Sequence, residues 1–358
     1  MIPVLYGKSE VNFESLGLGF LPDVISMEIT EERNGEFYLE AVFPADGKNV
    51  EYLAIDRVIL ARPAQGEPPQ PFRIRKMEKP EGSDTVQILA HHISYQLSET
   101  MVITYGENST IPTYSSAKDA MDFLFSHAKP DLSSVFQRQS NIVSTKAFGI
   151  KGEPVSVRAA LSGVEGSIVD VFGGELKFDK WTVKLLSSRG SSASKIIRYG
   201  LNLASLSYDV DVSGLITAYI GYFRLEEGPA IVGNMVYASN YSDFAYPRVE
   251  TIDFTEQLAG DYLPTTAQIT TATEAYVAGQ PTHNLMTSIT VEAVPDDLQN
   301  VHLCDTVTVV HPGFNLQQQA KIVKTVYDPI RERYISLTIG EIRKDITGTI
   351  AALIGVRK

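Results

Sequence analysis

Two alternating apolar segments joined by an Asn-Gly turn constrain the fold of this chain more than any other feature. The segments are Val24–Thr30 and Phe37–Phe43, with Asn34-Gly35 between them. An apolar period of two is typical of a strand with one buried face, and Asn-Gly tolerates the positive φ of a tight turn. The pattern therefore predicts an antiparallel hairpin.

Further short apolar segments of strand character follow the hairpin. They lie at Arg57–Ala61, Phe72–Met77 and Val86–Ala90. The intervening segment Pro63–Pro71 is too rich in proline for a strand and predicts an exposed loop. Several strands at this spacing are typical of a small antiparallel barrel or sandwich.

The pattern changes to α+β after about residue 97, where two helices are predicted. The first begins at a serine cap, Ser115 or Ser116, and Pro130 stops it. The second begins near Pro154, has apolar residues at helical spacing over 157–171, and is ended by Gly173-Gly174.

Strand patterns return in the second half of the chain. A hairpin through Asp179-Lys180 is followed by strand-like alternation over Ile196–Tyr222, notably in Gly214–Tyr222. Ala267–Ala278 predicts a threonine-rich helix. The remaining predicted strands are Ser288–Ala293, Thr306–Val310, Ala320–Asp328 and Tyr334–Gly340. Val307 and Val309 are two positions apart on the predicted strand, so both should face inward. A charge at either position should therefore disrupt the second barrel.

The expected fold class is α+β, a β-rich multidomain chain with two small β-barrel domains and α+β insertions. The expected domains are a first barrel at 1–97 completed by about 196–222, an α+β insert at 98–195, a connecting α+β domain at 223–285, a second barrel at 286–345 and a tail at 346–358.

Composition limits the function classes. Of 358 residues, 44% are hydrophobic and 21% charged, which is typical of a soluble globular protein. The formal charge of -12 disfavours non-specific binding to nucleic acid or anionic membranes. Neither a signal peptide nor an apolar span of membrane length is evident. Cys304, the single cysteine, predicts a buried inert thiol.

The histidines do not predict a metal site. His91-His92 is the one cluster, and neighbours on a strand face opposite sides, so one inward and one exposed side chain are expected. His302, Asp305 and His311 could meet across a hairpin, but their spacing matches no standard metal site.

Other polar patterns also lack a catalytic signature. Glu31-Glu32, Glu226-Glu227 and Asp296-Asp297 lie beside turn residues, where solvated loops are expected, although a glycosidase pair is not excluded. Ser187–Ser194 predicts a polar flexible loop, with phosphate binding as the weaker alternative, and Gly17-Leu18-Gly19 predicts a plain loop. We therefore predict no catalytic, cofactor-binding or metal-binding residues.

Three motifs in order resemble a known family. They are the ITEERNGEFYL hairpin at 29–39 with AHHISYQL at 90–97, IRYGLNL at 197–203 followed by Asp209, Asp211 and Ser213, and VHLCDTV at 301–307 with DPIRERY at 328–334 and Ile339-Gly340. This order resembles tail-associated proteins of long-tailed phages and prophages of Gram-positive hosts, a family labelled prophage tail endopeptidase or phage minor structural protein.

The resemblance implies a fold like the baseplate hub of contractile-tailed phages. Three subunits would close into a ring whose barrels line a channel, at the tip of the virion tail, after synthesis in the bacterial host cytoplasm. The implied partners are further copies of the chain, a distal tail protein, the tape measure protein and receptor-binding or fibre proteins, and DNA would pass through the ring unbound.

Two departures from the family accompany this expectation. Cys304 stands where the motif has glycine, which predicts a changed turn. The chain ends at Lys358, where members that cut cell walls continue into a peptidase domain, so we expect no enzyme activity. The alternatives are a cell-wall hydrolase and the hub of a contractile injection system.

Overall fold

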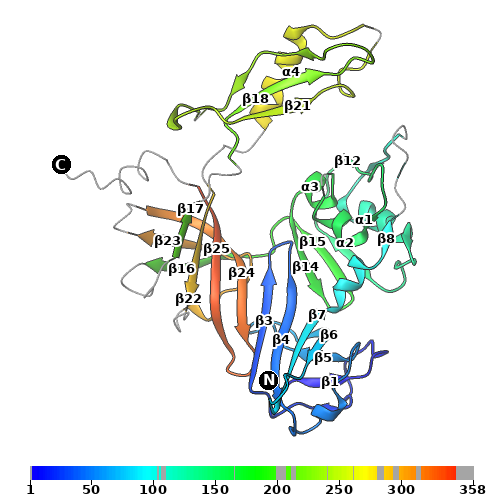
Figure 1. Cartoon of the computed structure of the whole chain (residues 1–358), viewed down its shortest axis with the longest axis vertical. Coiled ribbons are helices and arrows are strands. Elements are labelled where there is room, and N and C mark those ends of the chain that lie inside the picture. Colours follow the sequence, from blue (N-terminus) through cyan, green and yellow to red (C-terminus); the bar gives the residue numbers. More distant parts are fainter. Residues whose placement is uncertain are drawn as a thin grey trace, which may run out of the picture. The chain divides into compact units, whose positions relative to one another are not determined.

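The computed structural model describes residues 2–102, 105, 110–164, 166–198, 207–210, 215–239, 241–260, 262–279, 286–292, 298–311 and 316–343. The chain forms two compact units. Unit 1 comprises Met1–Leu206, Thr290–Thr308 and Ala320–Ile339, and unit 2 comprises Ser207–Ile289, Val309–Gln319 and Gly340–Lys358. Strands predominate over helices in the described part (Figure 1), so the β-rich α+β class is confirmed.

The first 98 residues of unit 1 supply seven strands of one sheet. They are β1 (Val4–Tyr6), β2 (Gly19–Phe20), β3 (Ser26–Glu32), β4 (Phe37–Pro44), β5 (Val58–Ala61), β6 (Gln70–Glu78) and β7 (Thr85–His92), with the 3-10 helices η1 (Val50–Tyr52) and η2 (Ile93–Ser98). Asn34 has φ 58° in the β3–β4 turn, as the hairpin prediction requires.

The sheet joins segments from both ends of the sequence. Its order is β24-β3-β4-β7-β6-β5-β1-β2, and these neighbours are antiparallel. β24 (Leu316–Asp328) pairs with β3 in the register Val326↔Thr30, and β25 (Arg333–Arg343) lies on its other side. Figure 1 shows the orange β24 beside the blue β3. β16 (Ser192–Arg198) pairs with β23 (Thr306–His311), which pairs with β24.

The segment of unit 1 that follows η2, here called the insert, contains both helices and strands. Its elements are β8 (Met101–Val102), β9 (Thr113–Tyr114), α1 (Ala117–Ser126), β10 (Ala128–Lys129), β11 (Gln137–Ser140), β12 (Lys146–Ala147), β13 (Val155–Ser156), α2 (Val157–Leu161), α3 (Ile168–Phe172), β14 (Glu175–Asp179) and β15 (Thr182–Leu186). Ser116 caps α1 by accepting a hydrogen bond from Asp119 N. β14 and β15 form the hairpin expected through Asp179-Lys180.

The single helix predicted from near Pro154 to Gly173 is wrong in two respects, because Val155–Ser156 form β13 and the structure divides the rest into α2 and α3. Gly163 has φ 139° and Gly166 has φ 75°, and both values are incompatible with a continuing α-helix. Gly173, with φ 73°, ends α3 as the sequence predicts.

One hydrophobic core runs from the sheet of unit 1 into the insert. Buried sheet residues such as Phe72 and Leu39 belong to the same cluster as Met121 of α1 and Leu185 of β15. The segment Pro63–Pro71 contains the predicted loop, but its ends are buried and Pro71 already lies in β6. The insert and the sheet are therefore packed as one body.

Unit 2 contains a small sheet and a helix. Its described elements are β17 (Ser207–Val210), β18 (Ala218–Phe223), β19 (Ile231–Val232), β20 (Val236–Tyr237), η3 (Tyr241–Asp243), β21 (Val249–Asp253), α4 (Thr266–Gly279) and the start of β22 (Met286–Glu292). β21 runs parallel to β18, while β19 and β20 are antiparallel to it. Phe223, Phe254 and Ile269 form the buried centre.

The two-barrel arrangement and the domain boundaries stay predictions. Among the described strands no ladder closes into a barrel. β18 pairs within unit 2 and not with the strands of 1–97, because β19, β20 and β21 occupy its edges. The β24–β3 pairing also places strands of the two expected barrels in one sheet.

Candidate functional site

A buried ion pair joins the first hairpin of unit 1 to the segment before β16. Arg189 Nη2 lies 2.7 Å from Glu31 Oε1, and the side chains are 8% and 10% exposed. Burial acts to lower the pKa of Arg189, but the nearby carboxylates, led by Glu31, outweigh it and raise that pKa. Glu31 therefore does not lie in the solvated loop that the sequence predicts, since it is inside β3 with a partner.

Glu175, at the start of β14, extends this pair into a cluster. Its Oε1 lies 2.6 Å from Lys321 Nζ of β24, and its Oε2 accepts a hydrogen bond from Arg189 N at 2.7 Å. Burial acts to raise the pKa of Glu175, but Lys321 and the Arg189 N–H outweigh it and lower that pKa. The carboxylate thus stays ionised and joins the insert to the sheet.

Asp305 organises the turn before β23. Its Oδ1 accepts hydrogen bonds from Ser191 N at 2.7 Å and Ser191 Oγ at 3.0 Å, and its Oδ2 accepts one from His302 N at 2.8 Å. The segment Ser187–Ser194 is therefore not a free polar loop, because Arg189 and Ser191 are held by buried carboxylates. We call Glu31, Glu175, Arg189, Asp305 and Lys321 the Glu31 cluster.

Cys304 is buried beside this cluster, and burial raises the pKa of its thiol to about 12. Its φ of 72° is a backbone conformation that favours glycine. Gly190 lies so close that a Cβ there would collide with the Cys304 carbonyl. The turn therefore has a glycine-type backbone conformation with cysteine in place.

His92 is buried in the core of the sheet and His91 faces the opposite side, as alternation along a strand predicts, but His91 is half-buried where an exposed side chain was expected. Ser94 N donates to His92 Nδ1 at 3.2 Å, so Nε2 carries the proton and donates to Gln70 Oε1 at 3.3 Å. The ring stacks on Phe37 with centroids 4.5 Å apart. Burial lowers the pKa of His92 to about 3, with Arg158 adding to the effect. This histidine is a neutral, hydrogen-bonded core residue.

The other predicted candidates do not form a site in the described residues. Glu226 and Glu227 are exposed in a loop, whereas Asp296-Asp297 lies outside the described residues. His302 donates through Nε2 to Gln65 O at 2.9 Å, and the side chain of His311 is not described. Within the ranges that the structure covers, no group of three metal-ligating side chains is found, and no helix is long and apolar enough to cross a membrane.

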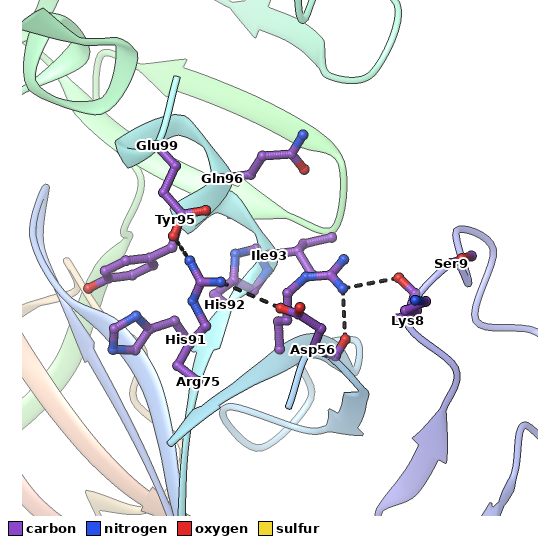
Figure 2. A pocket seen from close by; sticks show the side chains of 11 residues that line it. Lys8, Ser9, Asp56, Arg75, His91, His92, Ile93, Tyr95, Gln96 and Glu99 are labelled. Atoms are coloured by element: carbon purple, nitrogen blue, oxygen red, sulfur yellow. Dashed lines mark hydrogen bonds and ion pairs between the residues drawn. The ribbon is translucent and has the colours of Figure 1, made fainter. Parts of the chain in front are cut away.

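A cavity of about 420 Å³ opens beside β6, β7 and η2 of unit 1, and Figure 2 shows its side chains. Arg73 Nη1 donates to Lys8 O at 3.0 Å and to Asp56 O at 2.8 Å. Burial lowers the pKa of Arg73, against the attraction of Asp56. We call this cavity the Arg73 pocket.

Arg75 lies between two carboxylates at the pocket. Its Nη1 is 3.6 Å from Asp56 Oδ1 and its Nη2 pairs with Glu99 Oε1, as Figure 2 shows. His91 packs on Tyr95 with ring centroids 4.3 Å apart, and burial together with Arg75 lowers the pKa of His91. The histidine is therefore neutral at pH 7, and the cationic groups of the pocket are the arginines and Lys8.

Sequence reasoning missed this pocket. The one available signal was the segment RIR at 73–75, because two arginines spaced by two residues on a strand share a face. The partners Lys8 and Glu99 come from distant segments, and no local pattern links them to β6.

Residues 191–350 match the family described as prophage endopeptidase tail. The fold resembles solved phage-tail structures over nearly all of the chain. A prophage tail protein from Listeria monocytogenes superposes with a TM-score of 0.59 at 16% identity, covering 99% of each chain. The resemblance to phage tail proteins is confirmed.

Two further tail proteins have a similar fold. The tail protein from Neisseria meningitidis has a TM-score of 0.57 at 10% identity, covering 95% of this chain and 96% of its own. The tail protein of prophage MuSo2 from Shewanella oneidensis has a TM-score of 0.56 at 10% identity, covering 98% of this chain and 100% of its own. No curated protein matches the sequence. The named structures are tail proteins, whereas endopeptidase activity is part of the family's description.

Proposed function

We propose that this protein is a structural component of the phage or prophage tail tip, a hub in which three copies close into a ring at the end of the tail tube. The match of residues 191–350 to a prophage tail family carries the proposal. The tail-protein fold over nearly the full chain supports it.

Exposed apolar side chains support a role in assembly. Unit 2 exposes tyrosines on its surface, with Tyr262 89% and Tyr246 62% exposed. In unit 1, Leu16 is exposed shortly before β2 and Phe20 is exposed within β2. β2 is the last strand in the described order of the sheet. Tyrosine is enriched in protein interfaces, and large exposed apolar side chains are available for contacts with other subunits. Such surfaces fit a subunit that works by binding other proteins.

The proposed partners follow from that role. Copies of the chain form the ring, a distal tail protein and the tape measure protein bind on the tube side, and receptor-binding or fibre proteins bind on the other. The negative charge of the chain, -12, would let DNA pass through the ring without adhering to it. The protein would be made in the host cytoplasm and then reside at the virion tail tip.

Light scattering combined with negative-stain imaging of the purified chain tests the proposal. We expect a hollow three-fold ring with three times the monomer mass. A monomer at every concentration would contradict a ring that is stable without the rest of the tail. A double variant, Tyr246→Ser with Tyr262→Ser, should weaken association if unit 2 forms the contact, whereas Val143→Ser, at a position 85% exposed in unit 1, serves as the matched control.

The family's description makes the endopeptidase the alternative that must be tested separately. Purified chain is incubated with peptidoglycan, and released soluble fragments are measured. We expect no release above the buffer control. Release that a single carboxylate substitution abolishes would replace the structural role with an enzymatic one. A sheath gene beside the coding sequence would instead favour the hub of a contractile injection system.

A further inference from the structure

We propose that the Arg73 pocket binds the carboxylate of an acidic side chain from a protein segment. The inference stands on the geometry of the pocket in unit 1 and does not depend on the hub proposal. Its central observation is that the protein fixes one edge of the Arg73 guanidinium and leaves the other edge open.

Arg73 Nη1 uses both of its hydrogens on backbone carbonyls, those of Lys8 and Asp56. Among the described residues, Nε and Nη2 of Arg73 have no hydrogen-bond partner. Neither atom is among the buried polar atoms that lack a partner, so both remain accessible. Nε–H and Nη2–H lie on the same edge of the guanidinium plane, which donates two parallel hydrogen bonds to a carboxylate. The backbone contacts thus hold Arg73 in place and leave this edge available to an anion.

Charge also favours an anion here. Lys8, Arg73 and Arg75 line the pocket against two carboxylates, Asp56 and Glu99, which leaves one net positive charge in a chain of net charge -12. Glu99 is 59% exposed, so it can move away from Arg75 when another carboxylate arrives.

The remaining lining favours a peptide as the source of the carboxylate. Gln96 is among the lining residues, and its side-chain amide can both donate to and accept from a peptide group next to the acidic residue. The volume of about 420 Å³ accepts a side chain with its adjacent backbone.

Saturation-transfer NMR on the full chain measures the binding. The probe is N-acetylglutamate N-methylamide, whose single charge is the side-chain carboxylate, and the matched neutral probe is the glutamine analogue. We expect the carboxylate probe to bind and the glutamine analogue to bind about tenfold more weakly. Equal binding of the two probes, or tighter binding of inorganic phosphate, would overturn the assignment.

Three variants separate recognition from folding. Arg73→Gln should raise the Kd of the carboxylate probe about tenfold, whereas Lys76→Gln, an exposed cation of the same strand, should leave it within about twofold. Glu99→Gln should lower the Kd about threefold, because it removes a competing negative charge. Structural damage would weaken binding in both Arg73→Gln and Glu99→Gln, so opposite directions are the decisive result.

Self-association then distinguishes the source of the carboxylate. If light scattering shows that Arg73→Gln no longer self-associates, the acidic side chain comes from a second copy of the chain. Unchanged association assigns it to a different protein, provided that the carboxylate probe still binds the wild type. If Arg73→Gln binds the carboxylate probe with unchanged affinity, the proposal is wrong whichever protein supplies the carboxylate.

Discussion

Arg189 and Glu31 form a salt bridge of 2.7 Å in the interior of unit 1, although they lie far apart in the sequence. Glu31 is in the first hairpin, and Arg189 lies between β15 and β16. The backbone N–H of Arg189 also donates to Glu175 at the start of β14. The Arg189–Glu31 pair therefore connects the insert to the sheet. Removing one partner would leave a buried charge without compensation.

Arg189→Met should lower the free energy of unfolding by about 3–5 kcal/mol, because Glu31 would stay buried and unpaired. Urea unfolding followed by the fluorescence of Trp181, the single tryptophan, measures this within unit 1. Lys76→Met removes a cation from the exposed pair with Glu78 and should change stability by at most about 1 kcal/mol. Equal effects of the two variants would show that Glu31 is solvated.

His92 predicts a specific pH dependence. The pKa of His92 is about 3 in the folded state, below its value in the unfolded state. At a pH between these two values the unfolded state binds a proton on this histidine and the native state does not. Its contribution is fully present above about pH 6.5 and is lost as the pH falls towards 3, by up to about 1.4 kcal/mol per pH unit. Urea unfolding of the wild type and of His92→Phe between pH 7 and pH 4 should show a shallower slope for the variant. A wild-type slope in His92→Phe would refute the assignment.

Val307→Asp should destabilise unit 1 by at least about 3 kcal/mol, because Val307 is fully buried in β23 and the new carboxylate would lack a partner. Thermal melting followed by Trp181 fluorescence measures the effect. Val143→Asp, at a position 85% exposed, should remain within about 0.5 kcal/mol of the wild type. A folded Val307→Asp variant with unchanged melting would contradict the strand's orientation.

Gly221→Ala should loosen the packing of α4 on β18 in unit 2. The added Cβ would collide with Thr273 Oγ1 and lie 2.7 Å from Phe254 Cε2, which should cost about 1–3 kcal/mol. Hydrogen exchange measured by mass spectrometry should show faster exchange in α4. Gly260→Ala meets nothing within 4 Å and should leave exchange unchanged. If hydrogen exchange in α4 of Gly221→Ala stays as slow as in the wild type, α4 does not pack against Gly221.

Local chemistry explains which elements the sequence predicts well. The Asn34-Gly35 turn, the Ser116 cap of α1 and the threonine-rich α4 depend on neighbours within a few residues, and all three agree with the structure. The break between α2 and α3 was missed because apolar spacing continues across Gly163, where only the backbone angle reveals the interruption.

Long-range chemistry explains the rest. Glu31 beside a turn motif predicts solvation, because nothing near it in the sequence indicates that Arg189 becomes its partner. The Arg73 pocket has the same origin, since Lys8 reaches Arg73 through a backbone carbonyl, a group that every residue carries. Sites built from distant or backbone partners leave no local pattern.

The pairing of β24 with β3 has a consequence for synthesis on the ribosome. β3 and β4 emerge early and can pair at once, but the other edge of β3 gains its partner only when β24 has been translated. Until then this edge presents unpaired backbone groups, a template for aggregation. Glu28, Glu31 and Glu32 place negative charges along β3, so nascent chains repel one another while that edge stays open.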